Sequence, residues 1–184
     1  RQGKSVVVSK ASEPNISEFS NMTKTIGNIN NIIETRNIIE TETCRLAAVR
    51  ATPQDVENLW AITHQPIQDH VAFSTYDRSF HRAIVAAAHN PVLLQVYDLI
   101  SDLIFRTEDI YTGLKDLSPE EQYAIVEENL QWHEDIIRAI DMKDRKQAAV
   151  RMQNHLKRAG ENLIQSFSSS VKHSSVASKH DEQA

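Results

Sequence analysis

Apolar residues in this chain recur at intervals of three and four positions over long stretches, which is the spacing of one face of an α-helix. Over residues 29–50, one such stripe contains Ile29, Ile32, Ile33, Ile39 and Leu46. Only 4 glycines and 5 prolines occur among the 184 residues, and no long stretch alternates as a strand would. The sequence therefore predicts one domain that is almost entirely helical.

Local signals mark where these helices begin. Thr52, Asn90 and Ser118 each precede a proline, and this arrangement is typical of a capping side chain before the first helical residue. Asp144 opens a last helix after a predicted turn at 141–144. We expect helices over residues 29–50, 53–66, 68–88, 92–107, 119–140 and 145–166. Because residues 92–107 are the most apolar, that helix is expected to be the most deeply buried.

Three histidines and an aspartate interrupt the apolar stripes. Asp77 and His81 are one helical turn apart and share a helix face. His133 and His155 flank the predicted turn by about 9 and 11 residues, or roughly 13 and 16 Å, so an antiparallel helix pair places them at similar heights. Three imidazoles and a carboxylate that converge in this way suit a zinc-like divalent ion with room for another ligand.

The histidines in the apolar stripes and Arg36 can each be interpreted in two ways. A single histidine on an apolar face is more often a core residue, and the pattern alone leaves a metal site and buried core histidines about equally open. Arg36 also lies within an apolar stripe, where a buried guanidinium requires an anion. The alternative is an ordinary ion pair with Glu40, four residues later, on a solvated edge.

The termini and the composition limit the remaining possibilities. Residues 1–10 read as a short strand or a disordered end, residues 11–27 as a linker, residues 28–167 as the helical domain and residues 168–184 as a disordered tail. A single cysteine, Cys44, fits a reducing, cytoplasmic setting. No apolar run is long enough to span a membrane. The net charge of -5 argues against nucleic-acid binding over the whole surface.

Several short motifs occur in an order that resembles a known family. They are Ile33-Glu34-Thr35-Arg36 with Glu40, Asp77-Arg-Ser-Phe-His81, Ala86-Ala-Ala-His-Asn90, and His133 followed by His155-Leu156. Over about residues 32–163 the chain resembles the effector-binding (FCD) domain of GntR-family transcription regulators, FadR subfamily, of the metal-carrying type. The first residues, RQGKSVVVS, resemble the wing strand that closes the family's winged helix-turn-helix domain.

The resemblance implies an antiparallel bundle of six to seven helices with a central pocket for ligand and metal. A divalent ion, zinc or alternatively nickel, would be held by Asp77, His81, His133 and His155. A small carboxylate or sugar-acid effector would complete the coordination of the metal and contact Arg36 and, as a weaker match to the family, Arg106. Asn90 is expected mainly to cap a helix, and it is also a candidate effector-binding residue if that cap lies beside the pocket. Such a domain is a sensor, not an enzyme. It would act in a homodimer that binds operator DNA through an upstream domain absent from this chain.

Two other functions remain open at this point. A metal-dependent hydrolase could use an open zinc position to activate water, although Glu134, beside His133, is expected to point off the metal face. A helical dimerisation module with core histidines would bind no metal and would tolerate the loss of Arg36.

Overall fold

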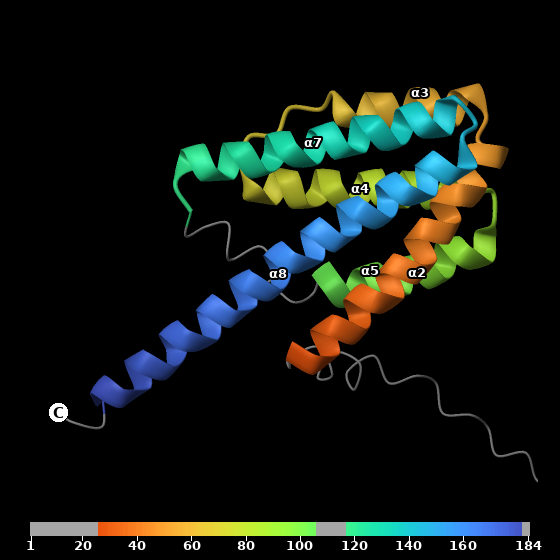
Figure 1. Ribbon diagram of the computed structural model, residues 1–184. Coiled ribbons are helices and arrows are strands. Elements are labelled where there is room, and N and C mark those ends of the chain that lie inside the picture. The colour runs from red at the N-terminus through yellow and green to blue at the C-terminus, as the bar shows by residue number, and fades with distance from the viewer. Residues whose placement is uncertain (1–25, 106–116, 182–184) are drawn as a thin grey trace, which may run out of the picture.

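The computed structural model describes residues 26–105 and 117–181 (Figure 1). Within these ranges the secondary structure consists of helices only, namely α2 (Ile26–Arg50), α3 (Pro53–Thr63), α4 (His70–Ala87), α5 (Pro91–Phe105), α7 (Pro119–Asp141) and α8 (Arg145–Asp181). The prediction of an all-helical bundle is confirmed. The expected strand at residues 1–10 and most of the expected linker lie outside the described residues, so these boundaries stay predictions.

The capping residues are where the sequence placed them. The Thr52 hydroxyl accepts a hydrogen bond from the Asp55 backbone N–H, and the Asp55 carboxylate accepts one from the Thr52 backbone in return. Ser118 and Glu121 form the same reciprocal box at the start of α7. The Asp144 carboxylate accepts backbone hydrogen bonds at the start of α8. These bonds satisfy N–H groups that would otherwise have no partner in the first helical turn.

Five of the described helices, α2, α3, α4, α7 and α8, contribute side chains to one buried core. α7 and α8 are joined by a short turn, in which Lys143 adopts a left-handed φ of 58°, and they pack against each other. α3 packs on α4 and α7, while α2 packs mainly along α8 and also against α4 and α5 (Figure 1). The buried apolar cluster between them includes Ala48, Leu59, Phe80, Ile84, Ile136, Ile140 and Met152.

Small residues bring α2 and α8 close together. A Cβ at Gly160 would lie 3.0 Å from the Ile33 side chain, so the absence of a side chain at this position permits the close approach. The Cys44 thiol donates to the Ala148 carbonyl across the same interface at 3.3 Å. This contact holds α2 in register with the helix that carries His155.

The expectation that α5 is the most buried helix is wrong. Val92, Val96 and Leu99 are 66%, 38% and 52% exposed, whereas Tyr97 and Ser101 are buried. α5 lies at the edge of the bundle, and its described contacts are with α2 and α4. Only one face of this helix is covered, because mean apolar character does not reveal how many neighbours a helix has.

α8 is longer than the sequence analysis expected. It extends as helix to Asp181, over most of the segment for which disorder was predicted, and its C-terminal part runs beyond the other helices (Figure 1). No glycine or proline follows Gly160, so nothing in the sequence interrupts a helix that is already formed. No helix in the described ranges is long and apolar enough to cross a membrane.

Candidate metal centre

Three helices bring the predicted metal ligands together. Asp77 and His81 lie one turn apart on α4, His133 lies on α7 and His155 on α8. Their exposed fractions are 7%, 0%, 0% and 1%, so the cluster is enclosed by the bundle. The expectation that these four side chains converge is confirmed.

The separations between the ligand atoms fit a small divalent ion. His155 Nε2 lies 3.1 Å from His81 Nε2 and 3.2 Å from His133 Nε2. Asp77 Oδ1 lies 3.6 Å from Nε2 of each of those two histidines, and all four ligand atoms lie within 4.8 Å of one another. Two ligand atoms of tetrahedral zinc, with bonds of about 2.1 Å, are roughly 3.4 Å apart. The donor set and its spacing therefore suit zinc or a similar metal.

Burial and neighbouring charges together set the protonation of three of these ligands. Burial and the nearby charge of His81 lower the pKa of His155 to about 3. Burial and His155 likewise lower the pKa of His133 well below its ordinary value. Burial raises the pKa of Asp77, but His81 and Arg36 outweigh this effect, so its pKa lies below the ordinary value. At neutral pH the site thus offers two neutral rings and a carboxylate, the forms that bind metals.

His81 has the opposite shift because acidic groups surround it. Burial alone would lower the pKa of His81, but the Glu40 and Asp77 carboxylates raise it above the ordinary value. A divalent metal held by His81 would require this ring to be neutral, so metal binding at this site would release a proton. Metal affinity is therefore expected to decrease as the pH falls.

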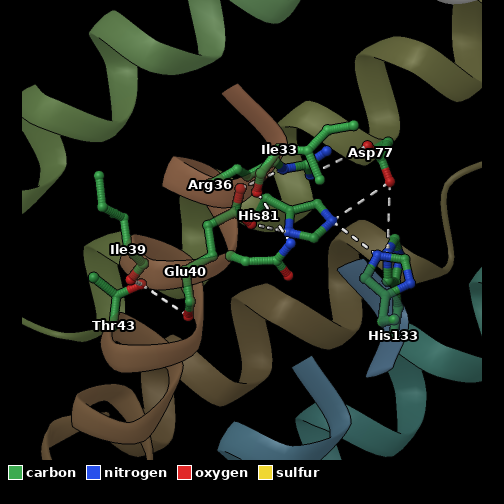
Figure 2. Close-up of polar contacts among 10 residues, drawn as sticks. Ile33, Arg36, Ile39, Glu40, Thr43, Asp77, His81 and His133 are labelled. Atoms are coloured by element: carbon green, nitrogen blue, oxygen red, sulfur yellow. Dashed lines mark hydrogen bonds and ion pairs between the residues drawn. The ribbon is translucent and has the colours of Figure 1, made fainter. Parts of the chain in front are cut away.

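The outer nitrogens of two histidines are held by further side chains. Glu40 Oε2 lies 2.5 Å from His81 Nδ1 as an ion pair, although the two atoms are not aligned as a regular hydrogen bond (Figure 2). The Tyr76 hydroxyl lies 2.7 Å from His133 Nδ1. Partners of this kind fix the ring orientation of a ligating histidine and the nitrogen that faces the metal. Glu40 and Tyr76 are thus functional candidates as well.

We expect Tyr76→Phe to weaken zinc binding without unfolding the domain. The aromatic ring, which is 3% exposed, would keep its packing, while His133 would lose the hydroxyl partner at its Nδ1. Loss of such a contact typically lowers metal affinity about 10-fold or more. Chelator competition on the purified variant measures this change. Tyr123→Phe, at a residue that is 68% exposed, is the matched control, and equal zinc affinities for both variants would contradict the prediction.

Arg36 lies beside the candidate metal ligands, and it also pairs with Glu40. Its Nε contacts Glu40 Oε1, and its Nη2 lies 3.9 Å from Asp77 Oδ2 (Figure 2). The pair with Glu40 was one alternative, but its placement on a solvated edge is wrong, because Glu40 is 1% exposed. The Arg36 side chain is 15% exposed, so a guanidinium is placed next to the candidate metal ligands.

Of the other two predicted effector residues, the described structure places only Asn90, and it lies away from this cluster. The Asn90 carboxamide oxygen accepts hydrogen bonds from the Val92 and Leu93 backbone, so Asn90 acts as a helix cap. Ala88, at the end of α4, lies about 10 Å along the helix from His81, which separates the cap from the metal centre. Arg106 lies outside the described residues, and its role stays a prediction.

Glu134 behaves as the sequence predicted. Its carboxylate pairs with Arg138 at 2.7 Å, and its side chain is 36% exposed. It is thus engaged at the surface, beside His133 in sequence but not among the clustered ligand atoms.

Sequence reasoning assigned Glu40 only an ion pair with Arg36, and it assigned Tyr76 no role. Glu40 follows Arg36 by four residues, so it shares a face with a residue already singled out. Tyr76 falls at helical spacing between Phe73 and Phe80, where its hydroxyl is the unusual feature. A polar atom at a core position requires a partner, and this requirement was the available signal for both residues.

Comparisons with known proteins agree with the fold and with the motifs. The profile of a family described as the FCD domain matches residues 31–158. The galactonate operon transcriptional repressor of Escherichia coli K12 is 38% identical over 73 residues, which cover 38% of this chain and 32% of the repressor. The solved structure of E. coli McbR/YncC matches with a TM-score of 0.64 at 17% identity, covering 76% of this chain and 66% of that one. The chain thus matches about a third of the repressor's length, and the structural likeness shows the fold alone.

Proposed function

The chain belongs to the FCD domain family, and on that premise we propose that it is the ligand-sensing domain of a GntR-family transcription regulator, FadR subfamily, of the metal-carrying type. The observation that carries the proposal is the buried cluster of Asp77, His81, His133 and His155 with Arg36 at its edge. A relative that matches part of the chain is a transcriptional repressor, which supports the same role. The proposed role is sensing, not catalysis.

We propose that the cluster holds a divalent metal ion, with zinc as the first choice and nickel as the second. Imidazole ligands suit both metals, and a carboxylate oxygen is an accepted zinc ligand. The neutral state of His133 and His155 supports this assignment, because neither ring needs to lose a charge before it binds the ion. The metal would supply a Lewis-acidic position at which a ligand oxygen can bind.

The charge balance favours an anionic effector. A divalent cation beside the Asp77 carboxylate leaves one net positive charge, since Arg36 and Glu40 form a pair that is neutral overall. An enclosed positive charge is stabilised by a counter-anion. A small carboxylate or sugar acid provides that charge together with oxygens for the metal. Galactonate is the first acid to test, because the partial relative represses a galactonate operon.

Signalling requires the effector to bind two conformations of the protein unequally. An acid held by the metal and Arg36 can change DNA affinity only by its differential affinity for those conformations. We propose that the domain works in a cytoplasmic homodimer that reads two operator half-sites through an upstream DNA-binding domain. The wing-like sequence at residues 1–10 supports the position of that domain.

We expect galactonate, or another sugar acid of the same class, to raise the Tm of the zinc-loaded chain. Arg36→Gln removes the guanidinium next to the metal ligands and is expected to abolish most of this increase. The matched control is Arg45→Gln, because Arg45 lies on the same helix but pairs with the exposed Glu42. Thermal melting with a panel of small carboxylates measures both effects. An Arg36→Gln variant that responds to the acid as fully as wild type would contradict the proposed pocket.

A further inference from the structure

Glu40 lies between the candidate metal centre and the candidate anion-binding arginine. Its carboxylate belongs to α2 and is fully enclosed, with 1% of the residue exposed. One oxygen contacts Arg36 Nε, and the other lies 2.5 Å from His81 Nδ1 (Figure 2). A single carboxylate therefore serves two groups with different proposed roles.

Sharing the carboxylate makes the two contacts interdependent. A carboxylate that is closely paired with a guanidinium has less negative charge to offer a second partner, because the guanidinium polarises the carboxylate towards itself. A histidine ring whose outer N–H faces a more negative acceptor is a more basic metal ligand at its other nitrogen. Any change at Arg36 should therefore reach the His81 Nε2 atom through Glu40.

We propose that Glu40 is a positioning residue that couples metal binding at His81 to anion binding at Arg36. This inference rests on the proposed function and deepens it. An acid that binds Arg36 draws the guanidinium towards itself, and Glu40 is left to hold His81 more strongly. Effector and metal then reinforce each other's binding, and by thermodynamic linkage the factor is the same in both directions.

The burial of Glu40 and His81 favours this coupling over an ion pair with a purely structural role. An ion pair between solvated side chains is screened and exerts little influence beyond its own atoms. The His81 ring, however, is 0% exposed, and Arg36 also approaches Asp77 Oδ2 at 3.9 Å. A charge displaced at Arg36 thus acts on two metal ligands at short range through little solvent.

The first test is the zinc affinity of Glu40→Gln, measured by chelator competition with zinc alone. Loss of the carboxylate is expected to weaken zinc binding about 10- to 100-fold, as removal of other outer partners of metal ligands does. Glu42→Gln is the matched control, because it makes the same chemical change on α2 at a side chain that is 62% exposed. Melting of the metal-free proteins shows whether each variant is folded.

The second test is a double-mutant cycle that isolates the coupling. Arg36→Gln is expected to tighten zinc binding in the Glu40 background, because the whole carboxylate then serves His81. In the Glu40→Gln background the same change should have a smaller effect, by about 3-fold or more, which lies within the range for contacting groups. A direct charge effect of Arg36 on the metal would give the same factor in both backgrounds, and that result would overturn the proposal.

The outcomes separate this inference from the function on which it rests. A wild-type chain that binds no zinc would remove the metal centre and the coupling together. A wild-type chain that binds zinc as tightly as folded Glu40→Gln would overturn the coupling alone. Should Glu40→Gln fail to fold, Glu40→Asp keeps the charge, but its carboxylate is one methylene too short to bridge both partners. Unchanged zinc affinity in folded Glu40→Asp would equally overturn the proposal.

Discussion

Replacement of His133 by alanine is expected to abolish stoichiometric zinc binding. The wild-type chain should bind about one ion per molecule, because its histidine and carboxylate ligand atoms converge on one point. The variant lacks the ring whose Nε2 lies 3.2 Å from His155 Nε2 and 3.6 Å from Asp77 Oδ1. Two histidine rings and one carboxylate then remain, and α7 no longer supplies a ligand to the cluster. Metal analysis of purified protein after dialysis against zinc measures the loss.

The same substitution should remove the thermal stabilisation by zinc. Zinc at about a thousand times its dissociation constant stabilises the folded state by roughly 4 kcal/mol. For a chain of this size that free energy corresponds to an increase in Tm of roughly 8–16 °C. His64→Ala is the control, because His64 is exposed, its ring contacts Trp60, and it is not among the clustered ligand residues. A zinc-dependent increase that persists in His133→Ala would contradict the assigned ligand set.

The convergence of the metal ligands was predictable because helix geometry is nearly constant. The rise per residue is fixed, so the distances of His133 and His155 from their common turn determine their relative heights once the turn is located. The turn itself was located by the last apolar residue of α7 and the capping pattern at Asp144. In the structure the two rings lie with their centroids 4.7 Å apart.

The surroundings of the site were less predictable because they depend on which helices become neighbours. The sequence shows that Arg36 and Glu40 share a face, but it does not show that this face turns towards α4 and not towards solvent. Tyr76 and His133 are 57 residues apart in sequence, and only the packing of α4 against α7 brings them together. Such long-range partners leave no local pattern.

The burial of α5 was misjudged for a related reason. Its sequence is apolar around most of its circumference, and a helix of this kind is usually surrounded by others. Val92 and Leu99 are instead exposed, since the described neighbours of α5 cover only the side that carries Tyr97. Exposed apolar stripes are common where a further partner binds, a circumstance that one chain's periodicity does not encode.

Phe80 is expected to be the core residue whose loss most affects both stability and the metal centre. It is 0% exposed, and its ring stacks on His133 with a centroid distance of 3.8 Å and an interplanar angle of 15°. Phe80→Ala should lower the free energy of unfolding by about 3–5 kcal/mol, because it removes apolar contacts and leaves a cavity. In a chain of this size that loss corresponds to a decrease in Tm of roughly 6–20 °C.

A comparison of Phe80→Ala with Leu59→Ala separates the loss of stability from the loss of zinc affinity. Leu59 is also 0% exposed and belongs to the same core, but its aliphatic side chain cannot stack on His133 as the Phe80 ring does. Its replacement by alanine should lower the free energy of unfolding by about 2–5 kcal/mol. Phe80→Ala should weaken zinc binding as well, because His133 loses the ring that stacks on it, whereas folded Leu59→Ala should bind zinc like wild type. Chelator competition below the Tm of both variants measures the difference. Equal zinc affinities would mean that Phe80 supports the fold without orienting His133, and that the polar and ring partners of His133 suffice to hold it.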